Sequence, residues 1–203
     1  YGEKIILVGH SIGAYIAIEA LARRTRSNIF KGVVGIMPFL EANFRDSSYV
    51  SKDRWLRGWM WPVMFLLAFS LHVIGLLPHT FKQFFLRGNT ATMDSKAKDF
   101  TVANMLRFST ITNYLFLGRS EFIHHLAPFD WTRLGSFRSH SHFLYTTDDM
   151  WAPVHCFKQA QNTGVDATLL EGVPHGFSVG PASGNQRICS WLSEKIADLS
   201  RHQ

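Results

Sequence analysis

The stretch Lys4-Ile5-Ile6-Leu7-Val8-Gly9-His10-Ser11-Ile12-Gly13 decides the fold that we expect for this chain. Its first half is a short apolar, β-branched run that ends in glycine, which is typical of a fully buried strand. Over residues 12–24, alanine alternates with larger apolar residues and two arginines close the segment, which predicts a helix. A second buried strand is predicted over residues 31–37. Strand, helix and strand in this order imply a right-handed crossover and a parallel sheet, hence an α/β fold.

Length and composition exclude several classes of protein. A chain of 203 residues suits one domain with a substantial core. Its 46% hydrophobic and 18% charged residues exclude disordered, collagen-like and coiled-coil chains. The net charge of +6 is spread along the chain without a Lys/Arg block, so we expect no nucleic-acid partner. Two cysteines do not make a disulfide framework, which favours a reducing compartment.

The rest of the chain divides into an insertion and a return to the core. Residues 39–138 favour a largely helical, aromatic-rich cap insertion between strands. Strand patterns resume over residues 142–147 and 166–170, separated by a predicted helix. We therefore predict three parts: a core strand, turn, helix and strand over 1–38, a helical cap or lid over 39–138, and a C-terminal core over 139–203.

The pattern Gly9-x-Ser11-x-Gly13 places a serine between a predicted strand and a predicted helix. On such a strained turn the hydroxyl projects above the sheet, and we expect both glycines to let the backbone pass close by. The helix that begins at Ile12 points its N-terminus at the reacting atom, so the Ile12 N–H can donate to an oxyanion. His10, beside the serine, is expected to shape the pocket. The alternative is an ordinary glycine-bounded turn.

A nucleophilic serine needs a histidine base and an acid that orients the histidine. Asp149 lies just past a predicted strand and His175 in the loop after the next one, which is the chain order that accompanies such a turn. Because parallel strands end at one edge of a sheet, we expect Ser11, Asp149 and His175 to converge as catalytic residues. Asp148 is the competing acid, and a solvated loop position is the alternative for His175.

The sequence predicts no cofactor and no metal site. A phosphate-binding glycine loop and a dinucleotide fingerprint are both missing from the sequence. His124 and His125 are adjacent and point apart. His140 and His142 could share a strand face near Cys156, but no third and fourth ligand follows at zinc spacing.

The most apolar part of the insertion covers residues 59–77 and contains no Asp, Glu, Lys or Arg. Its length approaches a membrane span. However, a chain that leaves a sheet and returns to it must cross a bilayer an even number of times, and no second run of this kind is present. We therefore expect a hairpin or a helix in the membrane interface, with a lid packed on the core as the alternative. The membrane or lid residues are Trp59, Trp61, Phe65, Leu66, Phe69 and Leu77.

Motifs along nearly the whole chain point to a known family. They are Gly9-His10-Ser11-Ile12-Gly13-Ala14-Tyr15, Asp149-Met150-Trp151-Ala152-Pro153 and Val173-Pro174-His175, with Arg87-Gly88, Asn104-Met105-Leu106, Asn113-Tyr114-Leu115 and Leu117-Gly118 in the insertion. The chain resembles the lipid droplet-associated hydrolase family. The Asp-x-Trp-x-Pro element and the aromatic insertion are more specific to it than the serine turn.

This resemblance implies the C-terminal part of an α/β-hydrolase fold and a serine ester hydrolase of neutral lipids, of sterol ester or acylglycerol type. By the resemblance, Ser11 is the nucleophile, Asp149 the acid and His175 the base. It also implies a lipid ester substrate and attachment to the lipid droplet monolayer or the cytosolic face of the endoplasmic reticulum membrane. A thioesterase or acyltransferase would use the same residues. The alternative function is a non-catalytic lipid droplet or endoplasmic reticulum surface protein on a hydrolase scaffold.

Members of the resembled family carry a preceding half with the first strands of the sheet. That half includes a Pro-Gly-Asn-Pro-Gly-like loop that is expected to supply a second oxyanion donor. This chain begins at the nucleophile strand. We therefore expect a fragment in which the loss of one donor impairs catalysis about 10²–10³-fold and residues 5–8 form an apolar sheet edge.

Overall fold

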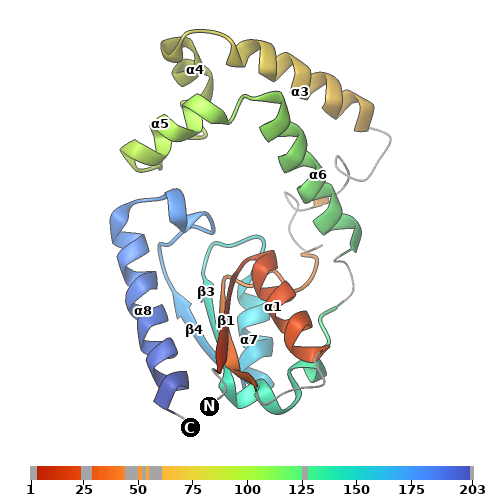
Figure 1. The fold of residues 1–203 in the computed structure, drawn as a ribbon, viewed down its shortest axis with the longest axis vertical. Helices are drawn as coiled ribbons and strands as arrows, with labels where there is room; N and C mark the ends of the chain where they lie inside the picture. Colours follow the sequence, from red (N-terminus) through yellow and green to blue (C-terminus); the bar gives the residue numbers. More distant parts are fainter. Residues whose placement is uncertain are drawn as a thin grey trace.

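The structure, a computed structural model, describes residues 4–23, 29–43, 50–51, 54, 61–124 and 128–201 of the 203. Its lower part is a core built around a parallel sheet, and an arched layer of helices lies above that core (Figure 1). The α/β class and the helical insertion between strands are confirmed.

The sheet has four parallel strands in chain order. β3 is buried along its whole length, and so is β2 from Gly32 onward. β1 forms one edge of the described sheet, and there Ile5 and Val8 are 45% and 46% exposed. The strands are β1 (Ile5–His10), β2 (Phe30–Ile36), β3 (Ser141–Thr146) and β4 (Asp166–Leu170).

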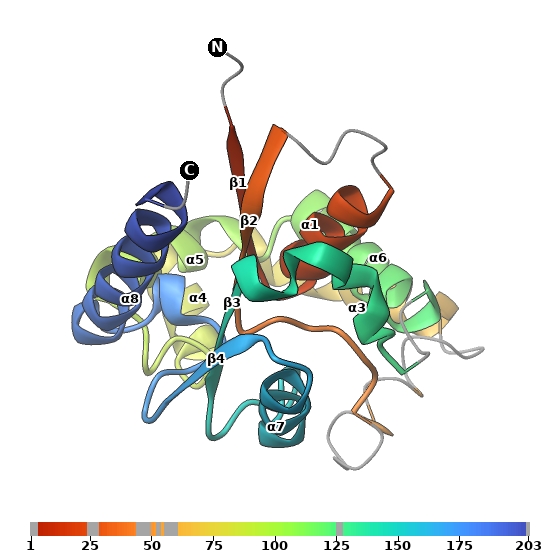
Figure 2. The same ribbon diagram turned by 90° about the horizontal axis from the view of Figure 1, so that it is seen from below.

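Helices cover both faces of the sheet (Figure 2). α1 (Ile12–Ala22) and α7 (Val154–Asn162) lie on one face, and α8 (Ala182–Arg201) lies on the other. Gly35 of β2 leaves room for its neighbours, because a Cβ there would lie 2.8 Å from Phe143 Cδ1 of β3 and 3.4 Å from the Ala14 Cβ of α1. The resulting core is a rigid platform from which the loops at the strand ends project.

The last part of the predicted insertion packs with the core. The 3₁₀ segment η2 (Trp131–His140) contacts α1 and β2. Phe129 and Leu134 are buried in the same apolar cluster as Val33 and Phe143. The predicted boundaries of the insertion at residues 38 and 138 stay predictions. Residues 129–138, which we predicted as part of the insertion, pack with the core.

The cap consists of α3 (Trp61–Gly75), α4 (His79–Leu86), α5 (Ser95–Asn104) and α6 (Phe108–His124). α3 packs on α6, and α4 packs on α5. Leu86, Val102 and Leu106 make a small buried cluster between them. α3 ends at Gly75, where the Leu106 carbonyl oxygen would lie 2.4 Å from a Cβ. The described cap helices therefore hold mainly to one another.

The predicted apolar run forms helix α3 followed by a turn at Leu76 and Leu77. Pro62 lies in the first turn of α3, where its missing N–H costs no helical hydrogen bond. Trp59 and the side chain of Trp61 lie outside the part of the chain that the structure describes. Among the helices that are described, none combines the length and the hydrophobicity needed to span a bilayer. The remaining predicted membrane residues are exposed: Phe65 by 48%, Leu66 by 70%, Phe69 by 58% and Leu77 by 40%.

Candidate active site

Ser11 occupies the sharp turn between β1 and α1, with φ 55° and ψ −126°. Residues other than glycine rarely adopt this conformation, and it persists only where its surroundings hold it. Here the Ser11 N–H donates to the Ile36 carbonyl at 3.0 Å, and the Ser11 carbonyl accepts from the N–H groups of Ala14 and Phe39 at 3.0 and 3.2 Å. Neighbouring backbone therefore fixes the strained turn and the direction of the hydroxyl.

The two glycines beside the serine differ in what they contribute. A Cβ on Gly9 would lie 2.5 Å from the Ala14 nitrogen and from the carbonyl group of Gly13, so only glycine fits there. A Cβ on Gly13 would meet no heavy atom of the described residues within 4 Å beyond its chain neighbours and the backbone of its own helix. The close backbone approach is therefore between Gly9 and Gly13, and it requires the missing Cβ at Gly9.

Ser11, His175 and Asp149 come together at the carboxyl ends of the strands. His175 Nε2 lies 2.8 Å from Ser11 Oγ, and His175 Nδ1 lies 2.6 Å from Asp149 Oδ2. These residues are separated by 164 and 26 positions in the sequence, and parallel strands bring them to one edge of the sheet. The arrangement has the connectivity of a nucleophile, a base and an orienting acid.

The Asp149 carboxylate is buried, and each of its oxygens takes part in a hydrogen bond. The Asp149 side chain is 0% exposed, and its Oδ1 accepts from the Trp151 N–H at 2.8 Å. An ionised carboxylate only accepts hydrogen bonds, so the proton between it and His175 belongs to Nδ1. In the neutral ring this leaves Nε2 as an acceptor, directed at the Ser11 hydroxyl. Asp148, the competing acid, is exposed and lies 3.5 Å from the hydroxyl of Thr147.

His10 supports the histidine loop from the β1 side. Its Nε2 lies 3.0 Å from the carbonyl oxygen of His175, so the His10 ring donates to that carbonyl. Its ring centroid lies 5.0 Å from those of His175 and Phe177. Burial, reinforced by the charge of His175, lowers the pKa of His10 below 6.5. The lowered pKa of His10 disfavours a second cation beside the base.

The first turn of α1 offers backbone donors next to Ser11. Ile12 is the first residue of α1, and the first N–H groups of a helix have no partner within it. The Ile12 side chain packs against the buried ring of Phe39, in a cluster that includes Trp151 of the acid loop. The same cluster thus joins the acid loop to the turn that carries the predicted oxyanion donor.

The sequence did not single out Glu121, which α6 brings within electrostatic reach of His175. Burial raises the pKa of the Glu121 carboxyl, and the charge of His175 opposes that rise. A single carboxylate in a helical insertion gives no sequence signal of this proximity. The cap therefore contributes a titratable group to the surroundings of the base.

The histidines considered for a metal site lie apart from Cys156. His142 Nδ1 lies 2.7 Å from Asp166 Oδ2, which also pairs with Lys195 at 2.9 Å. His140 contacts the hydroxyl of Ser139. Cys156 instead lies 3.7 Å from a Glu41 carboxylate oxygen, a contact that the sequence did not predict. His124 and His125 lie outside the side chains that the structure describes.

Several open clefts lie between described residues, and two of them adjoin the histidine loop and helix α4. One, of about 410 Å³, lies beside the histidine loop and is lined by Asp148, Val173 and Phe177 among others, without Ser11. The other, of about 520 Å³, lies on α4 and is lined by Thr80, Phe81, Phe84 and Phe85. The second is an apolar surface groove of the cap.

Solved structures with a similar fold include enzymes of the α/β-hydrolase class. An α/β hydrolase from a Medee basin deep-sea metagenome library has a TM-score of 0.58 at 15% identity, covering 98% of this chain and 66% of its own. The N-formylmaleamic acid deformylase from Pseudomonas putida S16 has a TM-score of 0.57 at 14% identity, covering 91% and 66%. At such identities the likeness shows the α/β-hydrolase fold alone.

Proteins related in sequence identify the family more specifically than the similar folds do. The Gallus gallus protein named lipid droplet-associated hydrolase is 22% identical over 204 residues, covering 97% of this chain and 60% of the relative. The Rattus norvegicus protein of the same name is 23% identical over 197 residues, covering 95% and 59%. The chain thus spans about 60% of the length of these curated relatives. The sequence profile described as lipid-droplet associated hydrolase matches residues 1–178, and the chain belongs to that family.

Proposed function

We propose that this chain carries the reactive groups of a serine ester hydrolase that acts on neutral lipids at the surface of lipid droplets. The observation that carries the proposal is the continuous hydrogen-bonded series from Ser11 through His175 to Asp149. The strained backbone of Ser11 supports it, because such strain persists mainly at functional sites.

In this mechanism, Ser11 Oγ attacks the ester carbonyl carbon while His175 Nε2 takes the hydroxyl proton. Asp149 stabilises the imidazolium that forms and keeps Nδ1 protonated. The Ile12 N–H donates to the developing oxyanion. The tetrahedral intermediate collapses, and His175 gives its proton to the leaving alcohol. Water, deprotonated by His175, then attacks the acyl group, and His175 returns the proton to Ser11 Oγ as the fatty acid leaves.

Two observations support the lipid droplet as the place of action: the names of the relatives and the exposed apolar side chains of the cap. The relatives are named for lipid droplets. On α3, the side chains of Leu66, Phe69 and Val73 are 70%, 58% and 50% exposed and follow the spacing of one helix face. Arg87 stacks over the ring of Phe84, 4.8 Å from its centroid, at the end of α4. An exposed apolar helix face suits a phospholipid monolayer over oil, and a cation of the cap suits its anionic headgroups.

The Ser11→Ala variant tests the proposed chemistry. Wild-type protein and variant are assayed on a sterol ester emulsion, a triacylglycerol emulsion and a soluble short-chain ester. We expect kcat to fall by about 10⁴-fold or more, because the nucleophile is lost. Ser193→Ala, at an exposed serine of α8, is the control and keeps wild-type turnover.

Each outcome has a distinct meaning. Equal turnover by wild type and Ser11→Ala would overturn the proposed hydrolase. Hydrolysis of the soluble ester alone would retain the serine mechanism and remove the neutral-lipid substrate. A Ser11→Ala protein that keeps its droplet phenotype in cells would favour the non-catalytic surface protein. Attachment to the endoplasmic reticulum stays a prediction, which fractionation of tagged protein would check.

A further inference from the structure

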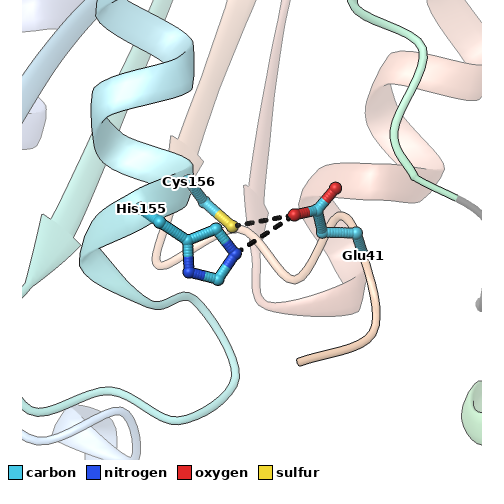
Figure 3. Close-up of side chains that lie close together, drawn as sticks. All are labelled: Glu41, His155 and Cys156. Atoms are coloured by element: carbon cyan, nitrogen blue, oxygen red, sulfur yellow. Dashed lines mark hydrogen bonds and ion pairs between the residues drawn. The ribbon is translucent and has the colours of Figure 1, made fainter. Parts of the chain in front are cut away.

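Three side chains capable of binding a metal converge below the cap, outside the site already described. Glu41 follows β2, and His155 and Cys156 stand in the first turn of α7. Figure 3 shows the imidazole of His155 and the thiol of Cys156 both directed at the Glu41 carboxylate. Glu41 Oε1 lies 3.2 Å from His155 Nε2 and 3.7 Å from Cys156 Sγ, and the three ligand atoms lie within 4.8 Å of one another.

We propose that Glu41, His155 and Cys156 bind a divalent cation of the zinc class, with a water molecule or a further ligand completing a tetrahedron. A thiolate, an imidazole and a carboxylate are the donors that Zn²⁺ prefers in proteins. The site is independent of the proposed hydrolase activity. Binding displaces the Cys156 thiol proton to solvent, and His155 binds as neutral imidazole.

The spacing of the donors fits this coordination. Zinc bonds of about 2.0–2.1 Å to nitrogen and oxygen and about 2.3 Å to sulfur give tetrahedron edges of about 3.4 Å for N–O and about 3.6 Å for S–O. The observed separations of 3.2 and 3.7 Å match these edges. A cation could therefore occupy the centre with small side-chain movements.

The burial of these three side chains would hold a bound ion and still let an ion reach them from solvent. Cys156 is 2% exposed within the core cluster, which protects a thiolate from oxidation. The side chains of Glu41 and His155 are 14% and 27% exposed, so a hydrated ion can reach the donors from that side. The second oxygen of Glu41 accepts from the Phe129 N–H at 3.3 Å, which orients the carboxylate as ligand-supporting partners do.

The position of the site gives the ion a structural consequence. Glu41 lies on the segment that leads from β2 into the cap, and Phe129 lies where the chain returns from it. α7 follows the loop that carries Asp149. Nearby, the Asn43 side chain donates to the Met150 carbonyl at 2.9 Å and so links the segment that carries Glu41 to the loop that carries Asp149. A bound ion would therefore join the segment of Glu41 to the start of α7, which follows the loop of the proposed acid, and the Glu41–Phe129 hydrogen bond would link the returning connection to it.

Metal binding by the purified protein, stripped with a chelator, tests the site. Titration with Co²⁺ is followed by absorption, and Zn²⁺ binding by competition with a chromogenic chelator. We expect one ion per chain and a thiolate-to-Co²⁺ charge-transfer band in the near ultraviolet. Cys156→Ser should abolish that band, and Cys156→Ser and His155→Ala should each weaken Zn²⁺ binding more than about 100-fold. Cys189→Ser and His140→Ala are the matched controls and should keep wild-type binding.

Thermal unfolding supplies a second measurement. Saturating Zn²⁺ should raise the unfolding temperature of the wild type and of Cys189→Ser, because the ion binds only the folded state. It should leave Cys156→Ser and Glu41→Gln unchanged, each compared with its own metal-free form. Undetectable binding, a Co²⁺ complex without a thiolate band, or equal zinc stabilisation of wild type and Cys156→Ser would each overturn the proposal.

Discussion

In the core, the large apolar side chains of β2 and β3 are sealed between helices, whereas in the cap many aromatic and aliphatic side chains face outward. Phe143 and Tyr145 of β3 are fully buried, while Phe84 of α4 and Phe100 of α5 are 61% and 71% exposed. The exposed large apolar residues of the described cap run from Val63 to Leu117. Many exposed apolar side chains on one layer of helices suit contact with a partner or a membrane better than contact with water.

The difference separates two tasks within one chain. The core positions reacting groups, which requires packing dense enough to hold a strained serine and a buried carboxylate. The cap offers apolar area, and in the part of the chain that the structure describes one of its contacts with the core is the Asp94 N–H that donates to the Val179 carbonyl at 3.1 Å. Substitutions in the core should therefore change chemistry or stability, and substitutions in the cap should change surface attachment.

The largest expected effect is on the proposed catalytic series. Asp149→Asn keeps the shape of the side chain, but its amide can orient His175 in the wrong tautomer, so we expect kcat on a soluble ester to fall about 10⁴-fold. Steady-state kinetics on wild type and variant measure this. Asp148→Asn is the control, because Asp148 is exposed and lies outside the series. A larger loss in the Asp148 variant would reverse the assignment of the acid.

Alanine substitutions at the two glycines of the serine turn should change the free energy of unfolding in opposite directions. Gly9→Ala places a Cβ 2.5 Å from backbone atoms that cannot move independently, so we expect a loss of about 3 kcal/mol in the free energy of unfolding. Gly13→Ala fills open space in a helix, and we expect a gain of up to about 1 kcal/mol. Urea unfolding compares the two. Equal losses would contradict the geometry of the turn.

The sequence predicted the strands, the serine turn and the convergence of Ser11, Asp149 and His175 because local patterns and strand order determine them. Parallel strands end at one edge, so residues that directly follow them meet there whatever the intervening chain does. The Glu41 cluster could not be predicted in this way. Glu41 stands on an irregular segment 114 residues from His155, and no periodic pattern fixes its direction. The proximity of Glu121 to His175 likewise depends on how the cap folds over the core.

Surface attachment is expected to depend on the outer face of α3. Replacing Leu66, Phe69 and Val73 by serine should remove about 1 kcal/mol of transfer free energy for each side chain. Binding to a phospholipid-coated oil emulsion, measured by flotation, should then fall about 100-fold. The unfolding temperature should stay unchanged, because these side chains are already exposed. Ile16→Ser, at an exposed residue of α1, is the control in the core, and an equal loss there would show non-specific adsorption.

The smallest effect concerns the pH dependence of the core. The pKa of His10 lies below 6.5 in the folded protein because of burial and the charge of His175, whereas unfolding restores its ordinary value. Between those two values the unfolded state binds more protons, so His10 lowers stability as pH falls through this window. Urea unfolding at pH 7.5 and 5.5 should therefore show a smaller loss for His10→Asn than for wild type. Asn can still donate to the His175 carbonyl, and only the change between the two pH values is compared. An equal loss in both proteins would mean that other groups carry the acid sensitivity of the core.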